Sequence, residues 1–408
     1  LFDQMVRRLK DAAELSVETV FIDGTKLEAC ANKYTFVWKK SVGKWEEKMF
    51  QKIQEAVMLL NHEYMQSFSV KIDSRIQDLQ TITRYLENKC QQNGTVFVYG
   101  RGKRKSKNQK YFELFRKFQE RQVTYDWHTA SFQGRNNYCK TDPDATFMHM
   151  KDDHMRNAQL KPGYNIQIGV DSEYIVATDV FSDRNDVWTL IPFLKTMDEK
   201  LRFRYPSVTA DSGYESEEGY TYLRETRQTP YIKPQTYEKW KRRSFKQDIS
   251  KRENMAYDAE TDVYTCYAQK KLSPVFVKKQ KSKSGYESEV TVYECEDCKD
   301  CPHKEKCTRA KGNKRLYVSK SFLEKRQESY ENILTETGIQ YRMNRSIQVE
   351  GAFGVLKNDY EFQKFLLRGK TKVKLEILLL CMGYNLNKLH AKIQNERIGF
   401  HLFKVKSA

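Results

Sequence analysis

Two apolar runs that lie far apart in the chain each end at an aspartate. Residues 16–22 (SVETVFI) lead into Asp23, and residues 207–210 (SVTA) lead into Asp211. Short apolar runs that stop at turn-forming residues are typical of buried strands. Each run therefore places a carboxylate at the end of a strand, and we expect both strands in one α/β core.

The chain is long enough for this core to carry insertions. Its 408 residues exceed one ordinary compact domain but suit a single core fold that has been enlarged. Between residues 45 and 90 apolar side chains recur at helical spacing, which predicts a helical hairpin. The members of its first apolar face are Trp45, Met49, Ile53, Val57 and Leu60.

The remaining elements follow an order that belongs to a known architecture. Residues 164–180 alternate around a short turn, which predicts a β-hairpin. An amphipathic helix at 186–201 precedes the strand that ends at Asp211, and a further helix and a short strand follow it. Without the insertions, this is the element order of an RNase H-like α/β domain.

We therefore predict an RNase H-like α/β fold with a mixed five-stranded sheet, interrupted by a helical insertion and by a cysteine-rich, metal-binding insertion. The predicted ranges are 1–30 for the start of the core, 31–155 for the helical basic insertion, 156–236 for the continued core, 237–320 for the cysteine-rich insertion, and 321–408 for C-terminal helices that carry a third acidic residue.

The net charge of the chain favours a polyanionic partner. Its 72 Lys and Arg residues outnumber 54 Asp and Glu residues, which gives a formal charge of +18. Basic residues are dense in two stretches, and each stretch is interpreted either as a solvated loop or as a contact with the DNA backbone. The candidate DNA contacts are Arg101, Lys103, Arg104, Lys105, Lys241, Arg242 and Arg243.

The ends and the hydropathy of the chain bear on its location. No apolar run approaches the roughly 18 residues of a membrane span. The opening LFDQMVRRLK is charged and helical in pattern, unlike a signal peptide, and it starts at Leu1. We expect a soluble, cytoplasmic protein that does not contact membranes, and an N-terminal region that is missing.

The third acidic residue lies in the C-terminal part. Residues 340–359 are helical by period, and Glu350 and Lys357 lie seven positions apart, or two turns. Both side chains can therefore face one site. A carboxylate that binds a metal, beside an ammonium group that holds a substrate phosphate, is a chemically sensible pair.

At this point the sequence resembles a known family. Five stretches together look like the DDE transposases of bacterial insertion sequences, in particular the group whose core carries a cysteine-bearing insertion, and the likeness covers nearly the whole chain. These stretches are FIDGTKLEACANKYTFVWKK (21–40), KTDPDATFMHMKDD (140–153), LKPGYNIQIGVD (160–171), TADSGYESEEGY (209–220) and RSIQVEGAFGVLKNDYEFQKFLLRG (345–369).

The resemblance implies an RNase H-like fold and three metal-binding acids, which correspond to Asp23, Asp211 and Glu350. Related transposases with a tyrosine, arginine, glutamate and lysine signature place the lysine seven positions after the glutamate, as Lys357 is. In that signature the tyrosine lies seven positions before the glutamate and the arginine four positions before it, where this chain has Met343 and Ser346. Tyr341 and Arg345 are displaced, which leaves their roles open.

Other acids compete for the same role. Asp142, Asp144 and Asp171 also lie in turn-like segments, and we interpret them as structural residues or as supports of the site.

The chemistry that follows is metal-dependent phosphoryl transfer. Three clustered carboxylates need cations between them, and their hard oxygen atoms suit Mg²⁺ or Mn²⁺. Two such ions can serve DNA cleavage and then strand transfer by the freed 3′-OH group. The resemblance implies two partners, double-stranded DNA as transposon ends and target and a second copy of the chain, and a bacterial, nucleoid-associated location. The alternatives are a structure-selective nuclease of the same fold and a catalytically idle DNA-binding protein.

Nine cysteines, an odd number, indicate a reducing compartment, and five of them crowd together. Paired C-x-x-C spacings suit a structural Zn²⁺ site with four thiolates. An iron–sulfur cluster and unligated thiols are the alternatives. The sequence leaves open which cysteine is excluded from the set Cys266, Cys295, Cys298, Cys301 and Cys307.

Overall fold

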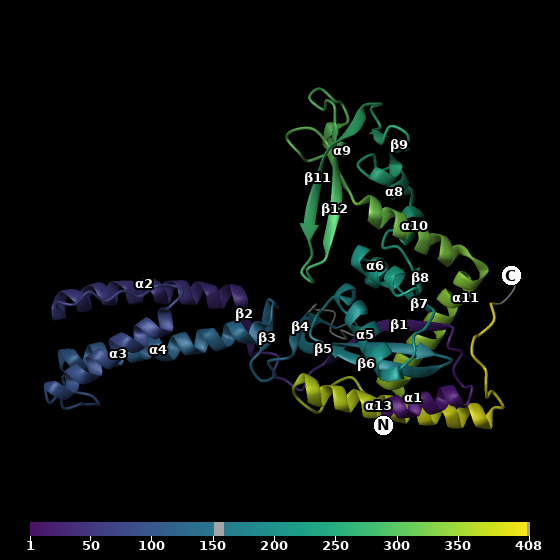
Figure 1. Cartoon of the computed structure of the whole chain (residues 1–408). Coiled ribbons are helices and arrows are strands. Elements are labelled where there is room, and N and C mark those ends of the chain that lie inside the picture. The colour runs from purple at the N-terminus through teal and green to yellow at the C-terminus, as the bar shows by residue number, and fades with distance from the viewer. Residues whose placement is uncertain (151–158, 406–408) are drawn as a thin grey trace. The chain divides into compact units, whose positions relative to one another are not determined.

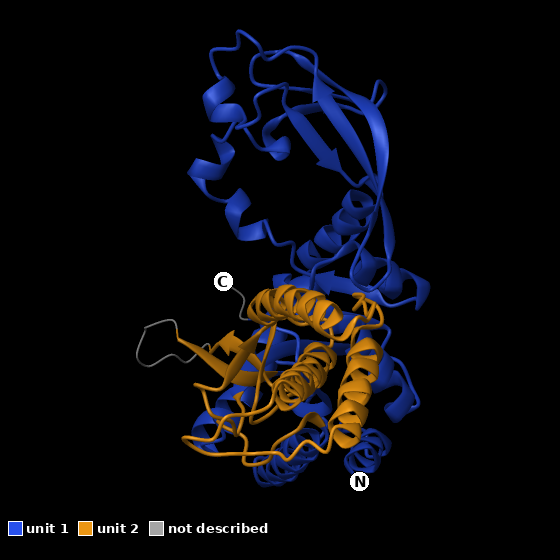
Figure 2. Cartoon of the chain, turned by 90° about the vertical axis from the view of Figure 1, so that its left-hand side faces the viewer, with its two compact units in different colours: residues 1–27, 165–363, 371–408 blue, residues 28–164, 364–370 orange. Residues whose placement is uncertain are grey.

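The computed structural model of the chain describes residues 1–150 and 159–405. It divides into two compact units, shown in Figure 2: unit 1 holds residues 1–27, 165–363 and 371–408, and unit 2 holds residues 28–164 and 364–370. The predicted end of the helical insertion, at residue 155, lies outside the described residues.

A mixed sheet forms the centre of the fold, which confirms the α/β class. Within the described ranges the sheet has six strands, in the order β4-β5-β1-β7-β8 with β6 paired to β5. The strands are β1 (Thr19–Glu28), β4 (Thr146–His149), β5 (Leu160–Asp171), β6 (Tyr174–Phe181), β7 (Ser207–Ala210) and β8 (Thr229–Ile232). The prediction of five strands was wrong, because β4 adds a sixth. It pairs with residues 160–163 at the start of β5, whereas β6 pairs with the later part of that strand.

The register of the sheet decides where the two aspartates lie. β1 and β7 run parallel, with Thr19 opposite Ser207 and Ile22 opposite Ala210. β7 and β8 are also parallel, whereas β5 and β6 form an antiparallel hairpin. Asp23 and Asp211 each follow the last paired residue of parallel neighbours, so both come to the same end of the sheet.

Helices of unit 1 pack on this sheet. The α6 helix begins as the sequence predicts, with the Ser216 hydroxyl accepting a bond from the Gly219 amide at 2.9 Å. In Figure 1, α13 runs along the hairpin of β5 and β6, and its Asn385 side chain bonds the backbone of Ile175. These elements are α1 (Phe2–Asp11), η1 (Asp186–Trp188), α5 (Leu190–Leu201), η2 (Ser212–Tyr214), α6 (Glu217–Glu225) and α13 (Lys370–Gln394).

A sharp bend sets the course of the helix that carries the third acid. A side chain on Gly338 would place its Cβ atom 2.0 Å from the Asn332 carbonyl oxygen, so only glycine fits. After the bend, Tyr341 packs edge-on against Phe21 of β1 and Tyr231 of β8. The elements are α10 (Lys320–Leu334), α11 (Glu336–Arg345), the π-helix η4 (Ser346–Glu350), α12 (Gly351–Gly354) and the π-helix η5 (Val355–Asp359).

The described part of unit 2 holds a bundle of three helices and a two-stranded sheet, besides β4 and the start of β5. Its core includes Met49, Ile53, Val57 and Leu60 as predicted, but Trp45 is 54% exposed, so its assignment to that face was wrong. Glu46 takes the inward position instead, where it pairs with Arg75 at 2.7 Å. The elements are β2 (Phe36–Trp38), α2 (Lys39–Tyr64), α3 (Arg75–Gln92), α4 (Lys107–Phe132) and β3 (Asn137–Cys139).

The cysteine-rich segment of unit 1 folds around a second, antiparallel sheet in the order β13-β12-β11-β10-β9. It has a small core of its own that includes Tyr264, Leu272 and Tyr293. The elements are α7 (Tyr237–Trp240), α8 (Arg243–Lys246), η3 (Arg252–Asn254), β9 (Ala256–Asp258), β10 (Val263–Thr265), β11 (Lys271–Lys281), β12 (Glu287–Cys295), α9 (Lys304–Cys307) and β13 (Arg315–Val318).

Candidate active site

The three predicted acids differ in how firmly the structure holds them. The side chain of Asp23 is 10% exposed, and its Oδ1 atom accepts a bond from the Gly24 amide at 2.8 Å. Asp211 is 42% exposed and caps η2 by accepting from the Gly213 amide at 2.8 Å. Glu350, on the helix, is 61% exposed. Two carboxylates are therefore oriented by backbone amides, and the third is the most exposed.

Arg345 lies among these three carboxylates. Its guanidinium nitrogens are 3.0 Å from Asp23 Oδ2, 3.9 Å from Asp211 Oδ2 and 3.9 Å from Glu350 Oε1. The Nε atom also donates to the Ile22 carbonyl oxygen at 3.3 Å. Residues from two strand ends and one helix thus converge on a single cationic group.

The π-helix explains why Arg345 reaches this position. Arg345 and Glu350 are five residues apart, and in a π-helix the backbone bonds run from residue i to i+5, so such residues return to one side of the helix. In a regular α-helix that role falls to residues three or four apart. The sequence carries no signal for the π-turn, so Arg345 is one position away from the place that the signature predicts.

The remaining residues of the signature lie on the same helical stretch. Lys357 is half-buried in η5. Tyr341 is buried against the sheet, and burial raises its pKa to about 12, with the nearby Glu18 carboxylate as the next cause. Tyr341 is therefore a neutral side chain that anchors the helix to the sheet.

The donor atoms of this site suit a divalent cation. All three side chains supply hard carboxylate oxygens, and they already surround one positive group. However, no group of three or more His, Cys, Asp or Glu residues in the described part of the chain is arranged closely enough to hold a metal ion. A metal would need the guanidinium to move and the acids to close.

A buried polar network lies next to the two aspartates, and sequence reasoning missed it. Tyr214 is fully buried and donates to Gln167 Oε1, while Gln167 Nε2 donates to Asn165 and to Asp186 at 3.0 Å each. Burial raises the pKa of Tyr214 well above its ordinary value, and the charges of Asp186, Asp23 and Asp211 add to this. The sequence signal that could have revealed this network is the alternation of side chains along β5, which puts Asn165 and Gln167 on one face of the sheet.

The competing acids are engaged in internal hydrogen bonds. Asp142 accepts from the Tyr164 hydroxyl at 2.8 and 2.9 Å, and Asp144 accepts from the Lys370 amide at 2.9 Å; all four residues belong to unit 2. In unit 1, Asp171 accepts from the hydroxyl of Ser16 at 2.7 Å. These carboxylates bind parts of the chain to one another.

The five clustered cysteines line one small cavity of about 20 Å³, together with His303. All are free thiols, and the Cys298 sulfur accepts a bond from the Lys314 amide at 3.4 Å. Burial raises the pKa of Cys295 to about 12, and a bond with Cys298 contributes. The thiols share one cavity, although within the described ranges they do not form a closed set of metal ligands.

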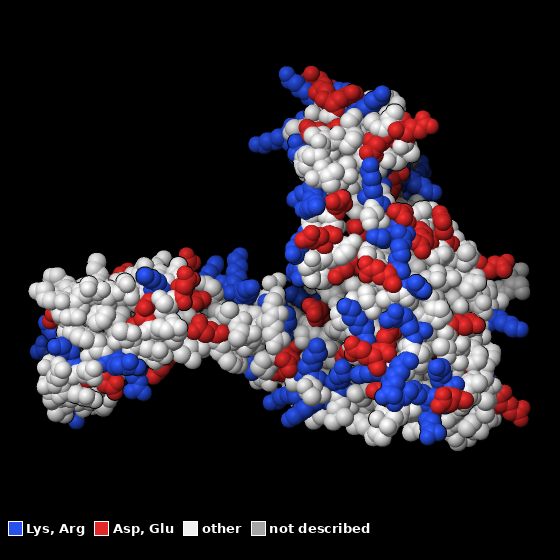
Figure 3. Space-filling model, viewed as in Figure 1, with Lys and Arg blue, Asp and Glu red and all other residues white. Residues whose placement is uncertain are grey.

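The predicted DNA contacts are mostly at the surface. Arg101, Lys103 and Arg104 are exposed in unit 2, where Lys105 pairs with Glu113; Lys241, Arg242 and Arg243 are exposed in unit 1. On the face drawn in Figure 3, basic side chains gather over the lower part of unit 1 but are interspersed with acidic ones. None of the helices in the described ranges combines the length and apolarity needed to cross a bilayer.

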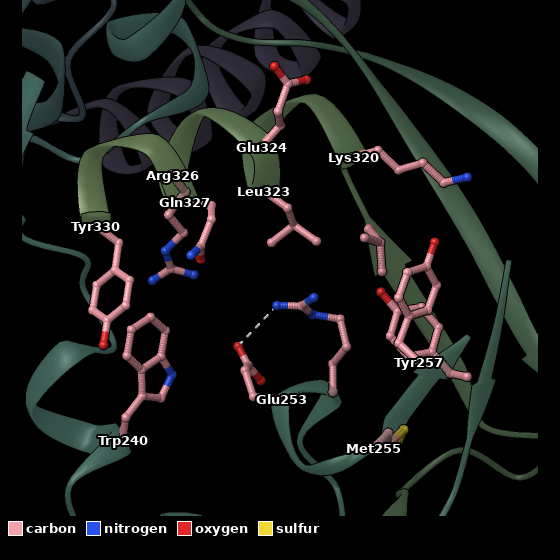
Figure 4. A pocket seen from close by; sticks show the side chains of 13 residues that line it. Trp240, Glu253, Met255, Tyr257, Lys320, Leu323, Glu324, Arg326, Gln327 and Tyr330 are labelled. Atoms are coloured by element: carbon pink, nitrogen blue, oxygen red, sulfur yellow. Dashed lines mark hydrogen bonds and ion pairs between the residues drawn. The ribbon is translucent and has the colours of Figure 1, made fainter. Parts of the chain in front are cut away.

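A pocket of about 580 Å³ lies between the cysteine-rich sheet and α10 (Figure 4). Trp240 and Tyr330 stand on one side, and Arg326 reaches in from α10. Arg326 also pairs with the buried Glu215 at 2.8 Å, four residues after Asp211. Burial raises the pKa of Glu215. None of the three acids around Arg345 lines this pocket.

Comparison with known proteins gives one match. Residues 265–390 match the sequence model of a family described as "Transposase DDE domain". The matched range includes the five clustered cysteines, Glu350 and Lys357, whereas Asp23 and Asp211 precede it. No curated protein and no solved structure matches the chain.

Proposed function

We propose that this chain is a transposase that cuts DNA at the ends of an insertion sequence and joins the freed 3′ ends to target DNA, which the match of residues 265–390 to a transposase DDE domain supports. DNA is the partner that such a domain implies. The observation that carries the proposal is the convergence of Asp23, Asp211 and Glu350 on one cationic group.

In this proposal the three carboxylates hold Mg²⁺ or Mn²⁺. Such ions activate the attacking oxygen and stabilise the leaving oxygen at phosphorus. The protein itself positions the reactants: the Gly24 and Gly213 amides orient two of the acids, and Lys357 holds a substrate phosphate. With a metal bound, Arg345 would no longer be needed between the acids and could pair with a DNA phosphate as a second cation.

The proposed RNase H-like architecture rests on the strand arrangement. An antiparallel hairpin, β5 and β6, lies on one side of β1, and the parallel strands β7 and β8 lie on the other. The order of these elements along the chain is the one inferred from the sequence. The exposed basic residues on both units support contacts with the DNA backbone. We further propose a homodimer that pairs two DNA ends, in the bacterial cytoplasm.

A strand-transfer assay tests the function. With labelled transposon ends, a supercoiled target and Mg²⁺, the full-length protein is expected to yield cut ends and then labelled target, because one site serves both steps. Cut ends without joined product would favour the structure-selective nuclease. Binding without any cut would favour the idle DNA-binding protein.

We also propose that four of the five clustered cysteines bind one structural Zn²⁺ ion, which their shared cavity supports. The protein purified without added metal is expected to contain about one zinc per chain by elemental analysis. The double variant Cys295→Ser, Cys298→Ser should lose it, whereas Cys90→Ser, at a buried cysteine of unit 2, should keep it. Iron and a brown colour would replace this proposal with an iron–sulfur cluster.

A further inference from the structure

A fourth carboxylate, Asp186, lies against both aspartate loops of the candidate active site. Asp186 begins η1, in the connection between β6 and α5, and is half-buried. Its Oδ1 atom accepts hydrogen bonds from the side-chain amides of Asn165 at 2.8 Å and of Gln167 at 3.0 Å. Two side chains on β5 therefore fix the orientation of this carboxylate.

Two glycines show how closely Asp186 approaches the loops of Asp23 and Asp211. A Cβ atom on Gly24, which follows Asp23, would lie 2.9 Å from Asp186 Oδ1 and 2.3 Å from Gln167 Nε2. A Cβ atom on Gly213, two residues after Asp211, would lie 3.5 Å from Asp186 Oδ2. A side chain at position 24 would push this network away, whereas a Cβ atom on Gly213 would meet Asp186 at an ordinary contact distance. Asp186 therefore lies close to both loops, and only the loop of Asp23 requires a glycine for this.

The two oxygens of Asp186 have different surroundings. Both amide donors bond Oδ1, and Oδ2 is the atom that lies toward Gly213 and the loop of Asp211. The buried Tyr214 lies beside it, and among the charges that raise the pKa of Tyr214 that of Asp186 ranks before Asp23 and Asp211. A hydrogen-bonding role alone would require only one acceptor oxygen and no charge.

We propose that Asp186 is a fourth acidic residue of the cation-binding centre, held by Asn165 and Gln167 so that its charge adds to those of Asp23 and Asp211. The inference rests on the proposed function, since it assumes that the three acids bind a divalent cation. It assigns Asp186 as a positioning residue that raises the affinity for that cation. Neutral amides on β5 suit this role, because they orient the carboxylate without cancelling its charge.

The test separates charge from hydrogen bonding. Asp186→Asn retains an oxygen that can accept from Asn165 and Gln167 but loses the charge, and Asp183→Asn removes the charge of an exposed acid in the same connection. Binding of Mn²⁺ to the full-length protein, without DNA, is measured by electron paramagnetic resonance. Asp186→Asn is expected to weaken Mn²⁺ binding by about tenfold, with an unchanged melting temperature, and Asp183→Asn should bind as the unaltered protein does.

Each other outcome has a defined meaning. Unchanged Mn²⁺ binding by Asp186→Asn would overturn the inference and leave Asp186 as a hydrogen-bond acceptor only. Should this variant lose stability, Gln167→Leu, which removes the amide but keeps the charge, must bind Mn²⁺ more tightly than Asp186→Asn. If Asp211→Asn also left Mn²⁺ binding unaltered, the metal centre of the proposed function would fail, and not Asp186 alone.

Discussion

Asp211→Asn reduces DNA cleavage and strand transfer by about a thousandfold or more, while the affinity for DNA changes little. The substitution retains the oxygen that caps η2 by accepting from the Gly213 amide, so the local backbone should survive. What it removes is one of the charges around the cation position. Cleavage of labelled transposon ends and an electrophoretic binding assay measure the two effects.

The control for this prediction is Glu225→Gln, which neutralises an exposed acid on α6. It should cut and join at the normal rate. If Asp211→Asn excised transposon ends at the rate of the unaltered protein, Asp211 would be removed from the site. Loss of both cleavage and DNA binding would instead indicate a fold defect, which a lowered melting temperature would reveal.

The second large effect is on stability and concerns Arg345. Arg345→Ala removes the guanidinium that lies 3.0 Å from the carboxylate of Asp23, a side chain that is only 10% exposed. A mostly buried charge that loses its partner costs about 3 kcal/mol, so the metal-free variant should melt several degrees lower. Mg²⁺ supplies the missing positive charge, so the gain in melting temperature between EDTA and Mg²⁺ should be larger than in the unaltered protein.

Arg342→Ala is the matched control, because it removes the same charge from the same helix at a side chain that lies over the Tyr237 ring. Its response to Mg²⁺ should equal that of the unaltered protein. Arg345→Lys should fall between the two, since an ammonium group cannot span three carboxylates as a guanidinium does. An Arg345→Ala protein with the normal melting temperature and the normal response to Mg²⁺ would refute the role of Arg345 as the internal counter-charge.

The sequence predicted those parts of the site that depend on strand ends. Asp23 and Asp211 follow runs whose apolar pattern is readable, and the parallel register of β1 and β7 then brings them together. Asp186 could not be found in this way, because it lies in an irregular connection and approaches the site through tertiary packing. β4 was missed because its pairing with β5 is a long-range contact of a short segment. Trp45 shows that helical spacing alone does not decide which of two neighbouring residues faces inward.

The wide turn between Arg345 and Glu350 also has an evolutionary consequence. A π-turn accommodates one additional residue, while the helical segments before and after it keep their contacts with neighbouring elements. It changes the number of residues that separate two side chains that meet in space. A regular α-helix would present the same pair of groups from positions four apart. Searches for proteins with this pair of groups by a fixed sequence pattern would pass over one form or the other, whereas a search by three-dimensional arrangement would recover both.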